Sequence, residues 1–262
     1  MPGRQIATRK TAKDEHELDL ALAAQLQAAL LPKACPVDCV HQAAAARNRM
    51  CSTIGGDFHD FLRVNEDQVA ILVGDVVGHG VRASLLMAQI MGFLRSLARD
   101  RLSRPTPVIS DLNAMLIDLG ERTGSVLSCS LFFAVIDAPT GVTFFVNAGH
   151  PRPLLFDRKQ CQALPLGTKN MVLGVEPFAP EEDCITFTPG QRMVLYTDGV
   201  TDAANASGAR FGEARLVEAI NSHSDDGPDS CADAIFDAVA AFRGTRPQVD
   251  DETVVVIDRL DK

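Results

Sequence analysis

The sequence lacks any apolar run that approaches the length of about 18 residues needed to span a bilayer. Residues 1–13 (MPGRQIATRKTAK) also lack the apolar core of a secretory signal peptide. These two absences argue against a membrane-spanning or exported protein. We therefore expect a soluble protein that stays in the cytoplasm and has no membrane partner.

The sequence also lacks the dense, even set of cysteines that is typical of a secreted disulfide framework. Its seven cysteines are scattered along the chain, and this favours a reducing compartment. Cys35 and Cys39 are spaced loosely like zinc ligands, but neither a second pair nor a histidine partner follows them. We therefore expect no zinc site at this pair.

Positive charge is in deficit. The chain has 25 Lys and Arg against 34 Asp and Glu, a formal charge of −9 and a pI of about 5.1. A field of this sign repels nucleic acid and anionic membranes, so neither is an expected partner. The 262 residues are 46% hydrophobic and 23% charged, a composition that is sufficient for a substantial core and ordinary for a globular protein.

Several motifs are absent as well. The sequence contains no internal repeat, no phosphate loop ending in GK[ST] and no G-x-S-x-G elbow, so it offers no support for a P-loop NTPase or a serine hydrolase. No Gly/Ser/Pro-rich linker divides the core. We expect one domain over 33–262, preceded by a helical segment at 14–32 and a disordered tail at 1–13.

Strand-like segments occur in runs, with helical segments grouped between them. This order favours an α+β fold with antiparallel sheets and helices packed outside, and it differs from regular βαβ alternation. We expect several strands within 40–76 and strands at 131–137, 142–148, 153–156, 184–187, 192–197 and 253–258, with helices at 81–100, 107–119, 212–222 and 229–242.

The segment 14–32 has its own pattern. Leucines recur every four residues from Leu18 to Leu30, so they form one apolar stripe on a helix over 14–31, and Pro32 ends that helix. Two interpretations remain open. The helix packs on its own domain, or it transmits a signal by pairing with a second copy or by docking on the catalytic core.

Acidic residues lie at the ends of four apolar strand segments: Asp57, Asp75, Asp198 and the pair Asp250 and Asp251. Taken singly, an Asp beside Gly is usually a turn residue. If they converge, two like charges 4 Å apart cost roughly 4 kcal/mol at an effective dielectric near 20. Protonation or bound cations would relieve that cost, and ligands that are all oxygen suit Mg²⁺ or Mn²⁺ rather than Zn²⁺.

Five motifs occur in a fixed order: GGDFHDF, GDVVGHG before a helix with RASLLMA, NAGHPRPLLF, YTDGVTDA and DDETVVV. In this order they resemble the SpoIIE-type bacterial serine phosphatases, a branch of the metal-dependent protein phosphatase superfamily with the protein phosphatase 2C fold. The resemblance extends from about residue 25 to about residue 260. It implies a sandwich of two antiparallel sheets flanked by helices.

The resemblance also implies two Mn²⁺ or Mg²⁺ ions. By motif, Asp75 would bridge both ions, and the ions would activate a water for attack on phosphorus. The implied metal ligands are Asp57, Asp75, the Val76 carbonyl, Asp198 and Asp250, with Asp251 as a reserve.

Histidines have separate roles in this interpretation. His79, four residues after Asp75, is the candidate catalytic acid for the leaving serine oxygen, with the bracing of a glycine turn as its alternative. His150 is expected to brace a turn, and His59 has no assigned chemistry. Eukaryotic relatives carry a phosphate-binding Arg where this chain has Ser52, so no residue is assigned to grip the phosphate.

The implied function is a protein serine/threonine phosphatase that hydrolyses phosphoserine or phosphothreonine. In the family, substrates are often phosphorylated anti-sigma-factor antagonists, so bacterial partner-switching signalling is the expected setting. Relatives commonly carry a helix such as 14–31 before the catalytic domain, and a homodimer through this helix is one possible arrangement.

Two alternatives come from other functional classes. VVGHGVRAS contains the glycine spacing of a dinucleotide-binding turn, with Asp100 in the place of the acidic residue. That interpretation requires Asp100 to end a second strand, but its surroundings are polar and basic. A catalytically silent phosphatase-like binding module is the other alternative. Loss of ligand aspartates would indicate it, and none is lost.

Overall fold

The computed structural model describes residues 12–32, 41–167 and 170–261. The disordered tail expected at 1–13 lies outside these residues, except for its last two, which begin a helix. The Cys35 and Cys39 pair also lies outside them. Among the described helices, none combines the length and the apolar character needed to cross a membrane.

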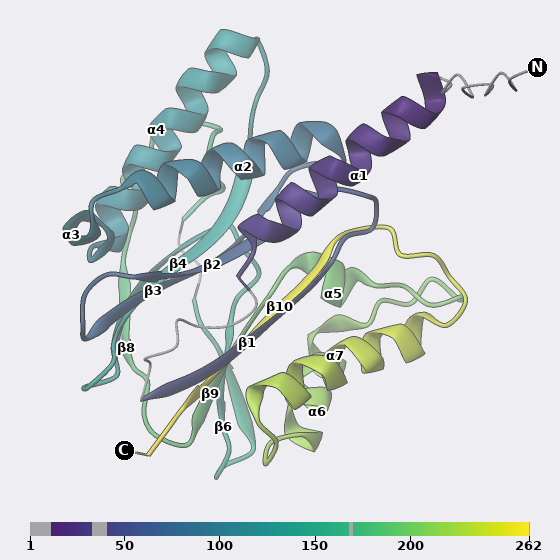
Figure 1. Ribbon diagram of the computed structural model, residues 1–262. Coiled ribbons are helices and arrows are strands. Elements are labelled where there is room, and N and C mark those ends of the chain that lie inside the picture. Colours follow the sequence, from purple (N-terminus) through teal and green to yellow (C-terminus); the bar gives the residue numbers. More distant parts are fainter. Residues whose placement is uncertain (1–11, 33–40, 168–169, 262) are drawn as a thin grey trace, which may run out of the picture.

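Within the described ranges, ten strands form two antiparallel five-stranded sheets that pack face to face (Figure 1). The first sheet has the order β1 (Gln42–Arg49), β10 (Glu252–Arg259), β9 (Gln191–Tyr196), β6 (Leu154–Asp157), β7 (Gln162–Pro165). The second has the order β2 (Phe58–Arg63), β3 (Gln68–Val76), β4 (Cys129–Asp137), β5 (Val142–Ala148), β8 (Asp183–Thr186). The expected α+β sandwich is confirmed.

Helices cover the outer face of each sheet (Figure 1). The second sheet carries α2 (Val81–Ser96), α3 (Arg99–Leu102) and α4 (Pro105–Thr123), with α1 (Ala12–Leu30) lying against α2. The first sheet carries α5 (Asp198–Asp202), α6 (Gly212–Ser222) and α7 (Pro228–Arg243). The N-terminal part of α1 extends away from the rest of the molecule in Figure 1.

The strands have two buried faces because helices and the opposite sheet cover them from both sides. In β3, Leu72 packs into the core under α2 and α4, while Val73 packs into the core between the sheets. In β10, Val256 and Val255 divide in the same way between the helical side and the inter-sheet core. Successive side chains of a strand point to opposite faces. Because both faces are buried here, the sequences of these strands are continuous apolar runs.

The elements expected from the sequence are present, but three short ones were not foreseen: β7, α5 and α3, a separate helix that follows the end of α2 at Ser96, where one helix was expected over 81–100. The hairpin joining 131–137 to 142–148 is confirmed, with Leu131 opposite Ala148. Strand β7 escaped detection because its four residues are exposed or half-buried and show no apolar pattern. Helix α5 has five residues, too few to show a helical period.

Residue Asp100 tests the dinucleotide-binding alternative. It lies in the short helix α3, whereas that alternative places it at the end of a strand. The sheets are also antiparallel, while dinucleotide-binding domains are built on parallel strands. The oxidoreductase interpretation is therefore wrong.

Candidate metal centre

The acidic strand ends meet at one end of the sandwich. Phe58 pairs with Gly74, so Asp57 and Asp75 come from adjacent ends of β2 and β3. In the other sheet, Val254 pairs with Tyr196. The end of β9 and the start of β10 are therefore also adjacent, and both lead into the remaining carboxylates, which are Asp198, Asp250 and Asp251.

Asp57 connects the two sheets. Its side chain is 1% exposed, and its Oδ2 accepts hydrogen bonds from the hydroxyls of Thr197 at 2.8 Å and Thr253 at 2.6 Å. Burial raises the pKa of the Asp57 carboxyl, and the nearby Asp75 charge raises it further, while the two hydroxyls oppose the change. A carboxylate from one sheet is thus held by donors from the other.

Neither threonine was singled out from the sequence. Thr197 directly precedes Asp198 in the motif YTDGVTDA, and Thr253 follows the acidic pair in DDETVVV. The backbone N–H of Thr253 donates to the Thr197 hydroxyl over 3.0 Å, which orients that hydroxyl toward Asp57. The motifs contained both residues, but local pattern does not reveal which carboxylate they serve.

Asp75 lies at the electrostatic centre of the cluster. Burial, followed by the charges of Asp198, Asp250 and Asp251, raises the pKa of its carboxyl to about 7. Burial also raises the pKa of Asp198 and of Asp250, and each is affected by a neighbouring carboxylate. Asp75 and these three neighbouring carboxylates are therefore close enough for their negative charges to repel one another. A bound cation relieves such repulsion.

Two glycines make room for the acceptor oxygens. A Cβ on Gly56 would lie 2.7 Å from the Val76 carbonyl oxygen and 3.3 Å from Asp75 Oδ1. A Cβ on Gly55 would lie 1.8 Å from Asp251 Oδ2. Any side chain at either position would force these oxygens away. The Gly-Gly pair is consequently a requirement of close approach as well as a bend.

Asp250 and Asp251 differ in what they contact. Asp251 is 3% exposed, and its two oxygens accept the backbone N–H groups of Cys51 and Gly56, each over 2.8 Å. It therefore braces the loop that leads to Asp57. Asp250 is exposed, and among the described residues its carboxylate accepts one hydrogen bond, from the Asp251 backbone N–H to Oδ1 at 2.9 Å. This contrast fits Asp250 as the ligand and Asp251 as the reserve.

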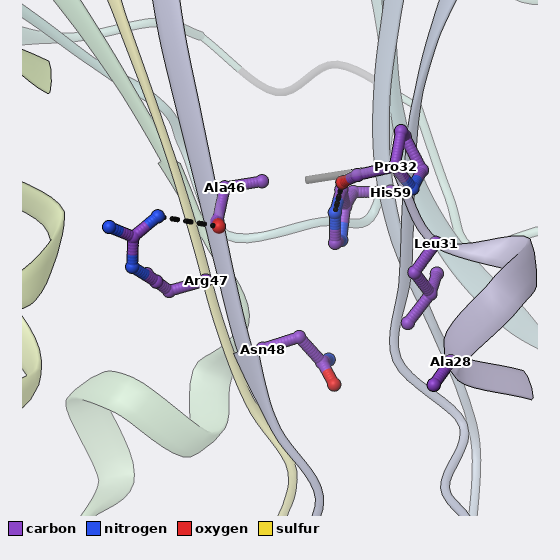
Figure 2. A pocket seen from close by; sticks show the side chains of 7 residues that line it. All are labelled: Ala28, Leu31, Pro32, Ala46, Arg47, Asn48 and His59. Atoms are coloured by element: carbon purple, nitrogen blue, oxygen red, sulfur yellow. Dashed lines mark hydrogen bonds between the residues drawn. The ribbon is translucent and has the colours of Figure 1, made fainter. Parts of the chain in front are cut away.

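The three histidines lie in different surroundings. His79 is exposed in the loop before α2, and its proximity partly opposes the rise that burial causes in the pKa of Asp250. His150 is buried and its Nδ1 lies 2.8 Å from the Ser130 hydroxyl, while burial lowers its pKa to about 3. The His150 ring thus contacts β4, while the Asn147 side chain bonds the His150 backbone in the turn, and the expected bracing of the turn by the His150 ring stays a prediction. His59 Nε2 donates to the Pro32 carbonyl over 2.8 Å (Figure 2), away from the carboxylates.

The donor set suits a hard divalent cation. Among the described residues, no group of three or more His, Cys, Asp or Glu side chains is placed so that it could hold a metal ion. Mg²⁺ and Mn²⁺ do not need one, because such ions are held by one or two carboxylates together with carbonyl oxygens and waters. The gap that Gly56 leaves beside Asp75 Oδ1 and the Val76 carbonyl is consistent with this mode.

Helix α1 contacts the same loop. Gln27 is 6% exposed; its Nε2 donates to the Gly55 carbonyl over 2.8 Å, and its Oε1 accepts the Gly55 N–H over 3.1 Å. Both backbone groups of one glycine are thereby satisfied by one side chain. This pairing was not foreseen, because Gln27 looked like one of several polar positions beside the leucine stripe.

A second connection passes beside a pocket of about 370 Å³ between the end of α1 and β1 (Figure 2). Asn48 lines this pocket, and its Nδ2 donates to the Thr253 hydroxyl over 2.7 Å. Thr253 in turn donates to Asp57. This chain of hydrogen bonds runs from β1 to the carboxylate at the start of β2.

The comparison with protein families identifies the chain. The model of the family described as Stage II sporulation protein E (SpoIIE) matches residues 65–260. The chain belongs to the SpoIIE family. Of the SpoIIE-type ligand candidates, Asp75, Val76, Asp198, Asp250 and Asp251 fall within the matched range, and Asp57 lies just before it.

Curated relatives of this SpoIIE-family chain are longer than it is. Protein IcfG of Synechocystis sp. is 27% identical over 232 residues, covering 79% of this chain and 36% of IcfG. Phosphoserine phosphatase RsbP of Bacillus subtilis is 24% identical over 208 residues, covering 79% of this chain and 50% of RsbP. The chain therefore spans half or less of the length of these two relatives.

Solved structures share the SpoIIE-type fold. The SiaA-PP2C domain of Pseudomonas aeruginosa has a TM-score of 0.81 at 19% identity and covers 96% of this chain and 99% of that one. RsbX in complex with magnesium has a TM-score of 0.62 at 14% identity and covers 84% of this chain and 96% of that one. The protein phosphatase 2C fold implied by the motifs is confirmed.

We expect Gln27→Ala to destabilise the loop between β1 and β2, here called the metal-site loop, in this SpoIIE-family chain. The substitution leaves the buried N–H and C=O of Gly55 without partners, at a cost of about 1–3 kcal/mol. Urea unfolding should show a lower midpoint, and titration with Mn²⁺ should show weaker binding. Gln25→Ala, at an exposed position of the same helix, is the matched control. Equal behaviour of the two variants would contradict the role of Gln27.

We also expect Mn²⁺ to raise the melting temperature, because an ion that binds only the folded state stabilises it by about 2.7 kcal/mol at a hundredfold excess over Kd. The pKa of Asp75 is raised in the folded state, so its charge costs stability above pH 7. Asp75→Asn should therefore raise the metal-free melting temperature at pH 8, by about 3–6 °C, and weaken the response to Mn²⁺.

Calorimetry with EDTA and with millimolar Mn²⁺ would measure both effects. Asp118→Asn is the control, because Asp118 pairs only with Arg122 on the exposed side of α4. Identical curves with EDTA and with Mn²⁺ in the wild type would show that the carboxylates do not share an ion.

Proposed function

We propose that the chain is a protein serine/threonine phosphatase that uses two Mn²⁺ or Mg²⁺ ions. The observation that supports this most directly is the convergence on Asp75, whose pKa is raised to about 7 by burial and by three neighbouring carboxylates. Membership of the SpoIIE family and the name of RsbP as a phosphoserine phosphatase support the same activity.

The proposed ligands follow the motifs. Asp75 would bridge the ions; the others are Asp57, the Val76 carbonyl, Asp198 and Asp250, with Asp251 in reserve. When bound, such ions lower the pKa of a water and neutralise charge on a phosphoryl group. The chain itself contributes the rest. The threonine hydroxyls hold Asp57 in one orientation, and the glycines admit the acceptor oxygens.

His79 is our proposed general acid for the leaving serine oxygen. Its exposure and its proximity to Asp250 support this role, because a substrate arriving from solvent would meet it there. The alternative is that His79 braces the turn between Gly78 and Gly80, both of which have positive φ. No hydrogen bond of the His79 ring to the described residues is present in the structure, which favours the first role.

The proposed substrate is a phosphorylated regulatory protein of the anti-sigma-factor antagonist type, in cytoplasmic partner-switching signalling. The family and the relatives support this class of substrate. A catalytically silent binding module is the second candidate, and the retention of every candidate ligand aspartate argues against it.

Turnover requires the ion in this proposal. We expect hydrolysis of p-nitrophenyl phosphate and of a phosphoserine peptide in Mn²⁺ or Mg²⁺, and none in EDTA. Asp75→Asn should lower kcat/KM by about a thousandfold, because replacing a shared carboxylate removes about 4 kcal/mol of transition-state stabilisation. Asp118→Asn should behave like the wild type. Turnover that persists in EDTA would contradict the proposal.

We further propose that α1 is a regulatory helix. Leu18, Leu22 and Leu26 are 47%, 49% and 71% exposed, while Leu30 is half-buried, so most of the stripe predicted from the sequence is open to solvent. The same helix contacts the metal-site loop through Gln27. An uncovered apolar stripe on such a helix is suited to bind a second copy of the chain or a partner helix. Because the same helix contacts the site, binding at the stripe would alter the conformation of the site.

Charges on the stripe test this role. Leu22→Asp together with Leu26→Asp should change the oligomeric state or the turnover and leave the Mn²⁺ effect on melting intact. Light scattering and phosphatase assays measure both. Ala21→Asp together with Gln25→Asp, at exposed positions beside the stripe, adds the same charge and serves as the control. Unchanged mass and turnover in a folded double mutant would leave α1 with no regulatory role.

A further inference from the structure

A second pocket, of about 310 Å³, adjoins the carboxylate cluster. It lies between the segment that follows α5, which includes Ala203 to Arg210, and the loop from Gly244 to Asp250 that leads into β10. These two segments lie beside each other in Figure 1. The charged residues that line the pocket are Arg210, Arg243, Arg246, Asp202, Asp250 and Glu252.

Two of the three arginines already have carboxylate partners. Arg210 Nη1 donates to both oxygens of Asp202, over 2.8 and 2.9 Å. Arg243 pairs with Glu252, whose side chain is buried. In each case the positive charge is balanced within the pocket wall, so these pairs contribute structure rather than an open binding charge.

Arg246 is different. Its Nη1 donates to the backbone carbonyl of Asn205 over 3.0 Å, and no carboxylate among the described residues lies within ion-pair distance of it. Arg246 is an exposed residue, so its remaining guanidinium donors are accessible to solvent. Once a cation neutralises Asp250, the charged groups that remain in the pocket are three guanidinium groups and the two carboxylates of Asp202 and Glu252, which are already paired. The uncompensated charge belongs to Arg246.

The loop that carries Arg246 is held in place beside Asp250. Gln248 Nε2 donates to the carbonyls of Arg49 and Asp250, each over 2.8 Å. The bond from Arg246 to Asn205 ties the same loop to the segment after α5. Arg246 therefore has a defined position relative to a proposed metal ligand, because both line the same pocket and the loop that joins them is hydrogen-bonded on both sides.

We propose that this pocket receives a carboxylate side chain of the phosphoprotein, next to the phosphoserine, and that Arg246 is the residue that selects it. The inference rests on the proposed phosphatase function. A guanidinium forms short, paired hydrogen bonds with a carboxylate. Because the chain as a whole has a charge of −9, an acidic substrate is repelled at long range. The guanidinium of Arg246 beside the site offsets this repulsion for substrates that carry an acidic residue next to the phosphoserine.

The test compares phosphoserine peptides whose flanking residues are Glu, Ala or Lys. For the wild type in Mn²⁺, kcat/KM should be highest with Glu. Arg246→Ala should lower the preference for Glu over Ala by about fivefold, the size expected for one partly exposed ion pair. Arg246→Glu should reverse the order and favour Lys. A purely structural role does not predict such a reversal.

Arg122→Ala, which removes an exposed arginine from α4, is the matched control and should keep the wild-type preference. A loss of equal size on all three peptides would overturn the inference and assign Arg246 to the fold or to the phosphate itself. An unchanged preference in both Arg246 variants would overturn it as well. Failure of the proposed function is distinguishable, because the wild type would then show no Mn²⁺-dependent turnover of p-nitrophenyl phosphate.

Discussion

Repulsion among carboxylates at one end of the sandwich is the constraint on which the rest of the site depends. Asp57 and Asp75 leave the second sheet there, and Asp198 and Asp250 leave the first. Burial and mutual charge raise the pKa values of all four. A folded chain that keeps such a cluster gives up stability in the absence of cations, and it regains that stability when a divalent ion binds.

The neighbouring residues hold the carboxylates in place. Threonine hydroxyls from the first sheet reach across to Asp57, and the backbone N–H groups of the loop before β2 hold Asp251. Gly55 and Gly56 permit the close approach that any side chain would prevent. These contacts make the carboxylate positions a property of how the two sheets pack. A change in sheet packing therefore reaches the site directly.

Two surrounding features connect this centre to other molecules in our proposals. Helix α1 keeps its leucine stripe exposed while Gln27 satisfies both backbone groups of Gly55, so one element faces both a partner and the site. On the other side, Arg246 supplies a cation that has no carboxylate partner within the described part of the chain, in a pocket that Asp250 also lines. Helix α1 would thus control turnover and Arg246 would choose the substrate, from two different sides of the same set of metal ligands.

The sequence by itself determined the class of fold, the order of its longer elements and the identity of the acidic cluster, because apolar periodicity and short motifs are local properties. It also predicted the leucine stripe of α1. Only the tertiary structure decided that Leu18, Leu22 and Leu26 stay exposed and that Thr197 and Thr253 donate to Asp57. It also decided that Gln27 pairs with Gly55 and that Arg246 has no carboxylate partner among the described residues. Thr197 is 140 residues from Asp57 and Gln27 is 28 from Gly55. Such contacts depend on the register of strands and the packing of two sheets, which no local pattern specifies.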